Sequence, residues 1–266
     1  VGDAFVERPS WVAPDAGLWA PEIVADADGF RLYYAASDTR QGGSAIGLAR
    51  SESPAGPWTD TGGPVVGPMD AACCPGSRRW TFDPEVLEHA GSEYLYFGSY
   101  FGGIDVAQLT PDGAGLVPGT QQPVATDNKY EGAQVVARNG WFYLLASATD
   151  CCRGPLTGYS VFAGRSRSPL GPFLDRDGAS LLAGRTGGPV TLSMNGNRWV
   201  GTGHHDVVTD FGGQDWMLYH AIDRTDPYFD GSVGFTKRPV LLDPLDWVDG
   251  WPTVRAGRWA SDSVQP

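Results

Sequence analysis

Lysine is nearly missing from this chain, and long apolar runs are missing altogether. Only Lys129 and Lys237 are lysines, and the formal net charge is −12. Like charges repel, so neither nucleic acid nor an anionic membrane is expected as a partner, and a neutral ligand is. No apolar run approaches the roughly 20 residues that span a bilayer. The sequence therefore predicts an uncharged ligand, with solubility alone as the alternative reason for the acidic charge.

The cysteine spacing of a zinc site and a long helical period are also absent. The four cysteines form two adjacent pairs, Cys73–Cys74 and Cys151–Cys152, whereas zinc ligands within one pair stand two to four residues apart. An even number of cysteines in loops indicates disulfides and a secreted or extracellular protein. Neighbouring Cα atoms lie about 3.8 Å apart, closer than the roughly 4.4–6.8 Å of ordinary bridges, so bridges within each pair would be strained.

Short strands and many turns are what the composition favours instead. Of 266 residues, 41% are hydrophobic, ten are Trp, 37 are Gly and 21 are Pro, with no low-complexity tract. A large core and frequent chain reversals suit an all-β protein.

A sequence repeat of about 50 residues occurs four times, starting near residues 19, 82, 130 and 189. Each copy opens with an apolar strand: APEIVAD, DPEVLEH, EGAQVVAR and PVTLSMN. A turn with Gly or Asn follows, and then further strands, which makes four strands per copy. In the fourth copy GHHDVVTD and DWMLYHA are the expected paired strands. Four-stranded units at this spacing indicate a β-propeller, with a β-sandwich as the alternative.

A propeller would place the starts of the first strands on one face. Asp83 and Glu131 would then lie at the mouth of the central channel on adjacent blades, with the aromatic residues Trp19, Trp80, Tyr100 and Phe101 near the rim. The two cysteine loops would approach each other on this face too. A bridge between the loops is therefore preferred, and two bridges within the pairs remain the alternative.

Two carboxylates that face one cavity fit glycoside hydrolysis. One protonates the leaving oxygen and another activates water, with about 6.5–9.5 Å between them in an inverting enzyme. Aromatic rings at the rim would stack on sugar faces. Alone, an Asp before Pro more often marks a turn, and it is the parallel placement of Asp83 and Glu131 that favours catalysis.

The motifs LWAPEIV, TFDPEV, YLYFGSYFGGI, YEGAQVV, CCRG, GHHDVV and LYHA together resemble glycoside hydrolase family 43, in particular its arabinanases and arabinofuranosidases. The resemblance covers nearly the whole chain, in order. It implies one five-bladed propeller domain over residues 1–266, inverting chemistry and a neutral arabinose-containing polysaccharide or oligosaccharide as substrate.

The resemblance also implies roles for single residues. Glu131 matches the general acid, and Asp83 matches the carboxylate that positions and tunes it. His204 matches a channel histidine beside a bound ion, calcium or another, which the chemistry itself does not require. His205 is expected to contact substrate, although the family has Asn-Ser where this chain has His205-Asp206. Independently of the resemblance, Arg153 beside the cysteines is expected to contact a sugar hydroxyl, with a neighbouring carboxylate as the alternative partner.

The family's general base sits in a blade that precedes the WAPE motif, and residues 1–17 resemble only the end of that blade. Four blades and a remnant are therefore expected, without an assigned base. A second polypeptide could supply the first blade. The competing functions are a carbohydrate-binding propeller without turnover and a β-xylosidase of the same family. Endo or exo action, and the L or D form of the arabinose, stay open.

Overall fold

The structure is a computed structural model, and it describes residues 2–184, 188–232 and 234–262. The chain forms two compact units, Val1–Asn128 and Lys129–Pro266, referred to below as unit 1 and unit 2. Apart from two 3-10 helices, Gly154–Leu156 (η1) and Arg255–Gly257 (η2), the regular structure of the described residues is strand. No helix in these ranges has the length and apolar character needed to cross a membrane.

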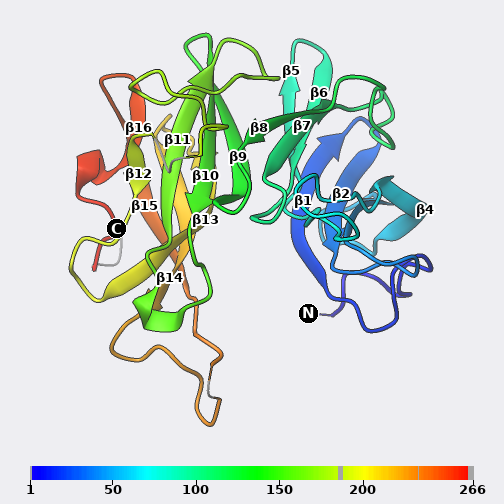
Figure 1. Ribbon diagram of the computed structural model, residues 1–266, viewed down its shortest axis with the longest axis horizontal. Coiled ribbons are helices and arrows are strands. Elements are labelled where there is room, and N and C mark those ends of the chain that lie inside the picture. The colour runs from blue at the N-terminus through cyan, green and yellow to red at the C-terminus, as the bar shows by residue number, and fades with distance from the viewer. Residues whose placement is uncertain (1, 185–187, 233, 263–266) are drawn as a thin grey trace. The chain divides into compact units, whose positions relative to one another are not determined.

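Unit 1 contains two four-stranded antiparallel sheets, each with its strands in sequence order (Figure 1). The first sheet has the order β1-β2-β3-β4 and the second β5-β6-β7-β8. The bounds are Leu18–Asp26 (β1), Gly29–Ala36 (β2), Ala45–Ser51 (β3), Thr59–Val66 (β4), Glu85–His89 (β5), Ser92–Phe97 (β6), Ile104–Gln108 (β7) and Gln122–Ala125 (β8).

Unit 2 repeats this plan with two more sheets. Their orders are β9-β10-β11-β12 and β13-β14-β15-β16, again antiparallel. The bounds are Tyr130–Arg138 (β9), Trp141–Ala148 (β10), Ser160–Ser166 (β11), Val190–Leu192 (β12), Trp199–Thr209 (β13), Asp215–Asp223 (β14), Val240–Val248 (β15) and Trp251–Val254 (β16). The prediction of an all-β protein built from four-stranded propeller blades is confirmed.

Two-residue turns that end in glycine close three of the hairpins. Ala90-Gly91, Asn139-Gly140 and Asp249-Gly250 all have positive φ at both positions. That backbone matches the right-handed twist of the flanking strands, which is why such turns dominate short hairpins. The Gly-bearing turns of the sequence repeat therefore set the register of these strand pairs.

The predicted start of the fourth blade is wrong. Residues 190–192, within the PVTLSMN stretch, pair with β11 and complete the third sheet as its last strand. The first strand of the fourth sheet is β13, which carries GHHDVVT and pairs with β14. Hydrophobicity alone could not separate these cases, because the last strand of one blade and the first strand of the next both read as short apolar runs.

Residues 2–17 form no strand. Phe5 makes an isolated parallel bridge with Trp58, and Val12 makes an antiparallel one with Thr39, all within unit 1. The remnant of a fifth blade, and the organisation of residues 1–266 as a single domain, stay predictions.

One residue with a left-handed backbone interrupts or precedes the first strand of every sheet. These residues are Ala20, Asp83, Gly132 and His204, with φ between 44° and 57°. In three sheets the pairing of the first strand also shifts at this point, as in a β-bulge. A bulge changes the direction in which nearby side chains point. Side chains at these positions therefore depart from the regular alternation between the two faces of the sheet.

The two sheets of unit 1 are joined by a buried ion pair as well as by an apolar core. Leu48 and Val66 of the first sheet pack with Leu95 and Phe97 of the second. Arg31 on β2 donates two hydrogen bonds to the carboxylate of Glu93 on β6, at 2.7 and 2.5 Å. The side chain of Arg31 is only 6% exposed, so its charge depends on this partner and on Asp26, whose Oδ2 lies 3.1 Å from Arg31 Nε.

Replacing Glu93 by Gln should therefore destabilise unit 1. Removing the charge of Glu93 leaves the buried guanidinium with Asp26 as its remaining carboxylate partner, and breaking a buried pair costs about 3 kcal/mol of unfolding free energy. Urea unfolding at pH 7 measures the change. The matched control is Arg78→Ala, which removes the exposed Arg78–Asp70 pair and should cost less than about 1 kcal/mol. Equal losses in both variants would contradict the assigned role of the buried pair.

Candidate active site

Unit 1 gathers the four predicted rim aromatics into one group with Phe82, a residue that the sequence analysis did not assign. Trp19 stacks on Phe82 with 5.4 Å between ring centroids, and Trp80 lies 6.4 Å from the same ring. Trp80 in turn contacts Tyr100 and Phe101, at 6.2 and 6.3 Å. Trp19 and Trp80 remain 57% and 46% exposed, which leaves aromatic surface for a sugar ring.

Backbone hydrogen bonds hold this aromatic group in place. The N–H of Trp80 donates to Phe101 O at 2.8 Å, and the N–H of Gly98 donates to Phe82 O at 2.8 Å. The hairpin of β5 and β6 is thus extended beyond its strands. Asp83 follows Phe82 directly and has φ 52°. The predicted carboxylate therefore lies between the hydrogen-bonded residue Phe82 and the start of β5.

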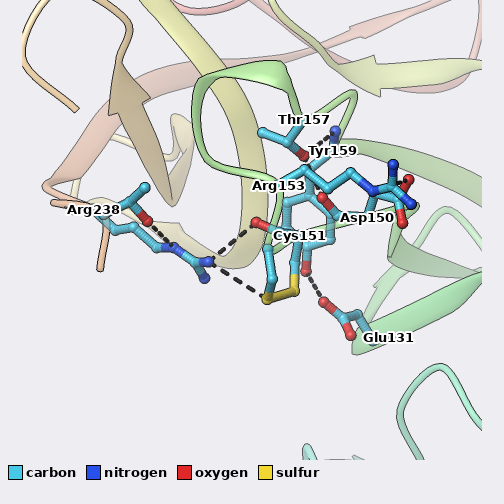
Figure 2. The surroundings of a disulfide bond; sticks show 9 residues. Glu131, Asp150, Cys151, Arg153, Thr157, Tyr159 and Arg238 are labelled. Carbon is cyan, nitrogen blue, oxygen red and sulfur yellow. Dashed lines mark hydrogen bonds and ion pairs between the residues drawn. A yellow bond between two sulfur atoms is a disulfide. The ribbon is translucent and has the colours of Figure 1, made fainter. Parts of the chain in front are cut away.

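Glu131 is the second residue of β9 in unit 2, and a buried tyrosine holds its carboxylate. Tyr159 is 1% exposed, and its hydroxyl donates a hydrogen bond to Glu131 Oε1 at 2.6 Å (Figure 2). A charge-assisted bond of this length fixes the orientation of the carboxyl group. Glu131 precedes the left-handed Gly132, whereas Asp83 is itself the left-handed residue of its blade, so the two carboxylates differ by one position in the repeat.

A column of parallel rings continues from Tyr159. The ring of His220 on β14 stacks on Tyr159 with 5.7 Å between centroids, and His204 on β13 stacks on His220 at 6.3 Å. Gly132 lies against this column, because a Cβ there would come within 3.2 Å of His204 Nδ1. Three of the strands of unit 2 therefore meet at Glu131.

The two histidines that are buried in unit 2 are held neutral. Burial, and then the charges of Arg238 and His204, lower the pKa of His220 to about 3. Burial, and then His204, also lowers the pKa of His205 to about 3. The exposed His204 is thus the histidine of this group that faces solvent.

The stacked imidazole of His220 is one neighbour of His204, the residue expected beside a bound ion. Among the described residues no group of three or more His, Cys, Asp or Glu side chains is arranged to hold a metal. The ion beside His204 stays a prediction, and the proposed chemistry does not depend on it.

His205 and Arg153 lie in different settings. The ring of His205 is buried, with Nδ1 3.5 Å from Ser147 Oγ. Arg153 is exposed and forms an ion pair with Asp150, with 3.3 Å between Nε and Oδ2. Substrate contact by either residue stays a prediction.

The preferred disulfide between the two cysteine loops is wrong. Cys73 bonds to Cys74, and Cys151 bonds to Cys152, although the Cα atoms within each pair are only 3.8 Å apart. The described cysteines are all paired in this way. The expectation rested on the ordinary Cα spacing of disulfides, which bonded neighbours do not obey.

In unit 2, Tyr159 and His220 are residues that sequence reasoning did not select. His220 lies inside the LYHA motif, and Tyr159 stands just before the third strand of its blade. The sequence shows where these two residues stand in the repeat. It does not show that their rings stack, because they lie in or next to strands of two different sheets.

Three comparisons with known proteins agree. The family model described as glycosyl hydrolases family 43 matches residues 1–252. The chain is 32% identical to extracellular endo-α-(1→5)-L-arabinanase 1 of Bacillus subtilis (88% of this chain, 68% of that protein). It is 31% identical to an extracellular exo-α-(1→5)-L-arabinofuranosidase of Cellvibrio japonicus (94% and 75%). A solved Cellvibrio cellulosa α-L-arabinanase complexed with arabinohexaose is similar, at 27% identity and TM-score 0.78 (96% and 84%).

Acid should destabilise unit 2 through the two buried histidines. Below pH 6.5 the unfolded chain binds protons that folded His205 and His220 do not accept until about pH 3. Stability is therefore complete above pH 6.5 and falls as the pH drops, by up to about 1.4 kcal/mol per pH unit for each histidine. Urea unfolding between pH 7 and pH 5 measures the slope.

His205→Asn and His220→Gln should each flatten that slope. His89→Gln is the matched control, because His89 lies on an exposed strand end of unit 1. Wild-type slopes in both buried-site variants would contradict the assignment.

Proposed function

This chain belongs to glycosyl hydrolases family 43, and from that membership we propose that it hydrolyses α-1,5-linked arabinofuranosyl chains with inversion. The observation that carries the proposal is the match over residues 1–252, within which the YEGAQVV segment folds into the start of β9. Relatives named for endo and for exo action on α-(1→5)-L-arabinan support this substrate class.

Glu131 is the proposed general acid. Its role is to protonate the oxygen of the leaving sugar, which needs a carboxyl group held in one orientation. The hydroxyl of Tyr159 supplies that orientation, and the neutral His220 stacked on Tyr159 adds no positive charge that would favour the ionised form.

Asp83 and the aromatic group of unit 1 are the proposed tuning carboxylate and sugar platform. Exposed tryptophan faces bind the apolar faces of furanose rings by stacking. Trp19 and Trp80 carry most of that exposed area. The general base, and a second polypeptide that would carry it, remain predictions from the sequence.

Action outside the cell is part of the proposal. Both quoted relatives are named extracellular, and two disulfides between neighbouring cysteines suit an oxidising compartment.

Sugar release from linear α-1,5-arabinan is the deciding measurement. We expect release by the wild-type chain and a loss of about 10²–10⁴-fold in Glu131→Gln, because an amide cannot donate the proton. Glu88→Gln, the same chemical change at an exposed position of β5, is the matched control and should keep full activity. Binding of arabinohexaose without release by the wild type would instead identify a carbohydrate-binding protein, and release from an aryl β-xyloside would identify a xylosidase.

Tyr159→Phe should move the alkaline limb of the pH–rate profile to higher pH. A hydrogen bond donated to a carboxylate stabilises its charged form, so losing the bond makes Glu131 hold its proton longer. The profile of kcat/KM on arabinotriose measures the shift. A limb that stays in place while the rate falls would mean that Tyr159 acts only in packing.

A further inference from the structure

The loop between β10 and β11 is closed on itself just before Tyr159. Thr157 Oγ1 donates to Asp150 O at 2.5 Å, and the N–H of Tyr159 donates to Thr157 Oγ1 at 3.1 Å. Between these points lie the bonded pair Cys151–Cys152 and the short helix η1. The loop is therefore a fixed feature, and its end is the residue that holds Glu131.

A second connection clamps this loop from the side. The segment between β14 and β15, orange in Figure 1, projects beyond those strands. Its Arg238 donates from NH2 to Cys151 O at 3.1 Å and lies 3.6 Å from Cys152 Sγ (Figure 2). Gly154 packs against it as well, since a Cβ there would be 3.0 Å from the hydroxyl of Tyr228. The disulfide and Arg238 thus form one surface.

This surface offers an apolar face flanked by hydrogen-bond donors. Cys152 is exposed and presents polarisable sulfur to solvent, and sulfur makes favourable contacts with ring edges and C–H groups. Arg153 has a 71% exposed side chain that is held at Nε by Asp150. Arg238 uses Nε for Thr236 and NH2 for the disulfide loop. Guanidinium donors beside an apolar patch are suited to a neutral sugar with several hydroxyl groups.

Figure 2 places the Cys151–Cys152 disulfide, Tyr159 and Glu131 in one neighbourhood. A general acid stands at the oxygen that links the departing sugar, so groups that border it contact the leaving part of the substrate. We propose that the Cys151–Cys152 disulfide, with Arg153 and Arg238, forms a subsite that binds the leaving-group arabinofuranosyl residue. This inference rests on the proposed role of Glu131.

The alternative is that this surface binds no sugar and that the disulfide only stabilises the loop. Substrates with and without a leaving sugar separate the two cases. The leaving group of arabinotriose is a sugar. The leaving group of α-L-arabinofuranosyl fluoride is a single fluoride ion, which makes none of the contacts of a sugar in this subsite.

The variants are Cys151→Ser/Cys152→Ser and, should that pair fail to fold, Arg238→Ala. We expect kcat/KM on arabinotriose to fall about tenfold or more, with kcat/KM on the fluoride changed less than about twofold. Arg198→Ala is the matched control, because this arginine of unit 2 pairs with Asp223 and stacks on Trp199. For Arg198→Ala, the ratio of kcat/KM on arabinotriose to kcat/KM on the fluoride should equal the wild-type ratio.

An equal fall on both substrates, or no fall on either, would overturn the subsite. Titration of Glu131→Gln with arabinohexaose, with and without the cysteine substitutions, gives a second reading: we expect weaker binding when the disulfide is removed. A wild-type chain that neither hydrolyses nor binds arabinan would instead refute the proposed function itself, which distinguishes the two failures.

Discussion

The left-handed residue in each first strand is the constraint on which the site depends. Regular strands alternate their side chains between two faces, and that alternation would bury or expose Asp83, Glu131 and His204 according to strand position alone. The interruption at these points frees the side chains from that pattern. Ala20 has the same left-handed backbone, although no chemistry is proposed there. The left-handed residue is therefore a general feature of the four-stranded blades.

A single tyrosine connects the remaining parts of unit 2. The hydroxyl of Tyr159 holds Glu131, its ring supports His220, and its backbone closes the disulfide loop. Gly203 makes room for that ring, because a Cβ there would come within 2.4 Å of it. The orientation of Glu131, the stacking of His220 and the closure of the neighbouring loop thus all involve one residue.

Charge is arranged differently in the two units. In unit 1 a buried arginine is compensated by Glu93 and joins two sheets. Unit 2 also has a paired buried charge, Asp215 with Arg138, and in addition two histidines, His205 and His220, that desolvation keeps neutral.

The sequence by itself determined the blade plan, the family resemblance and the aromatic group of unit 1. Alternating apolar runs and Gly-bearing turns encode four-stranded units locally, and residues that follow one another in a hairpin, such as Trp80 and Phe101, are brought together by that hairpin. Tertiary structure alone decided which strand opens the fourth sheet, which cysteines bond, and that Tyr159, His220 and His204 form a column beside Glu131. Those outcomes depend on contacts between strands that are distant in sequence, and a one-dimensional pattern does not specify such packing.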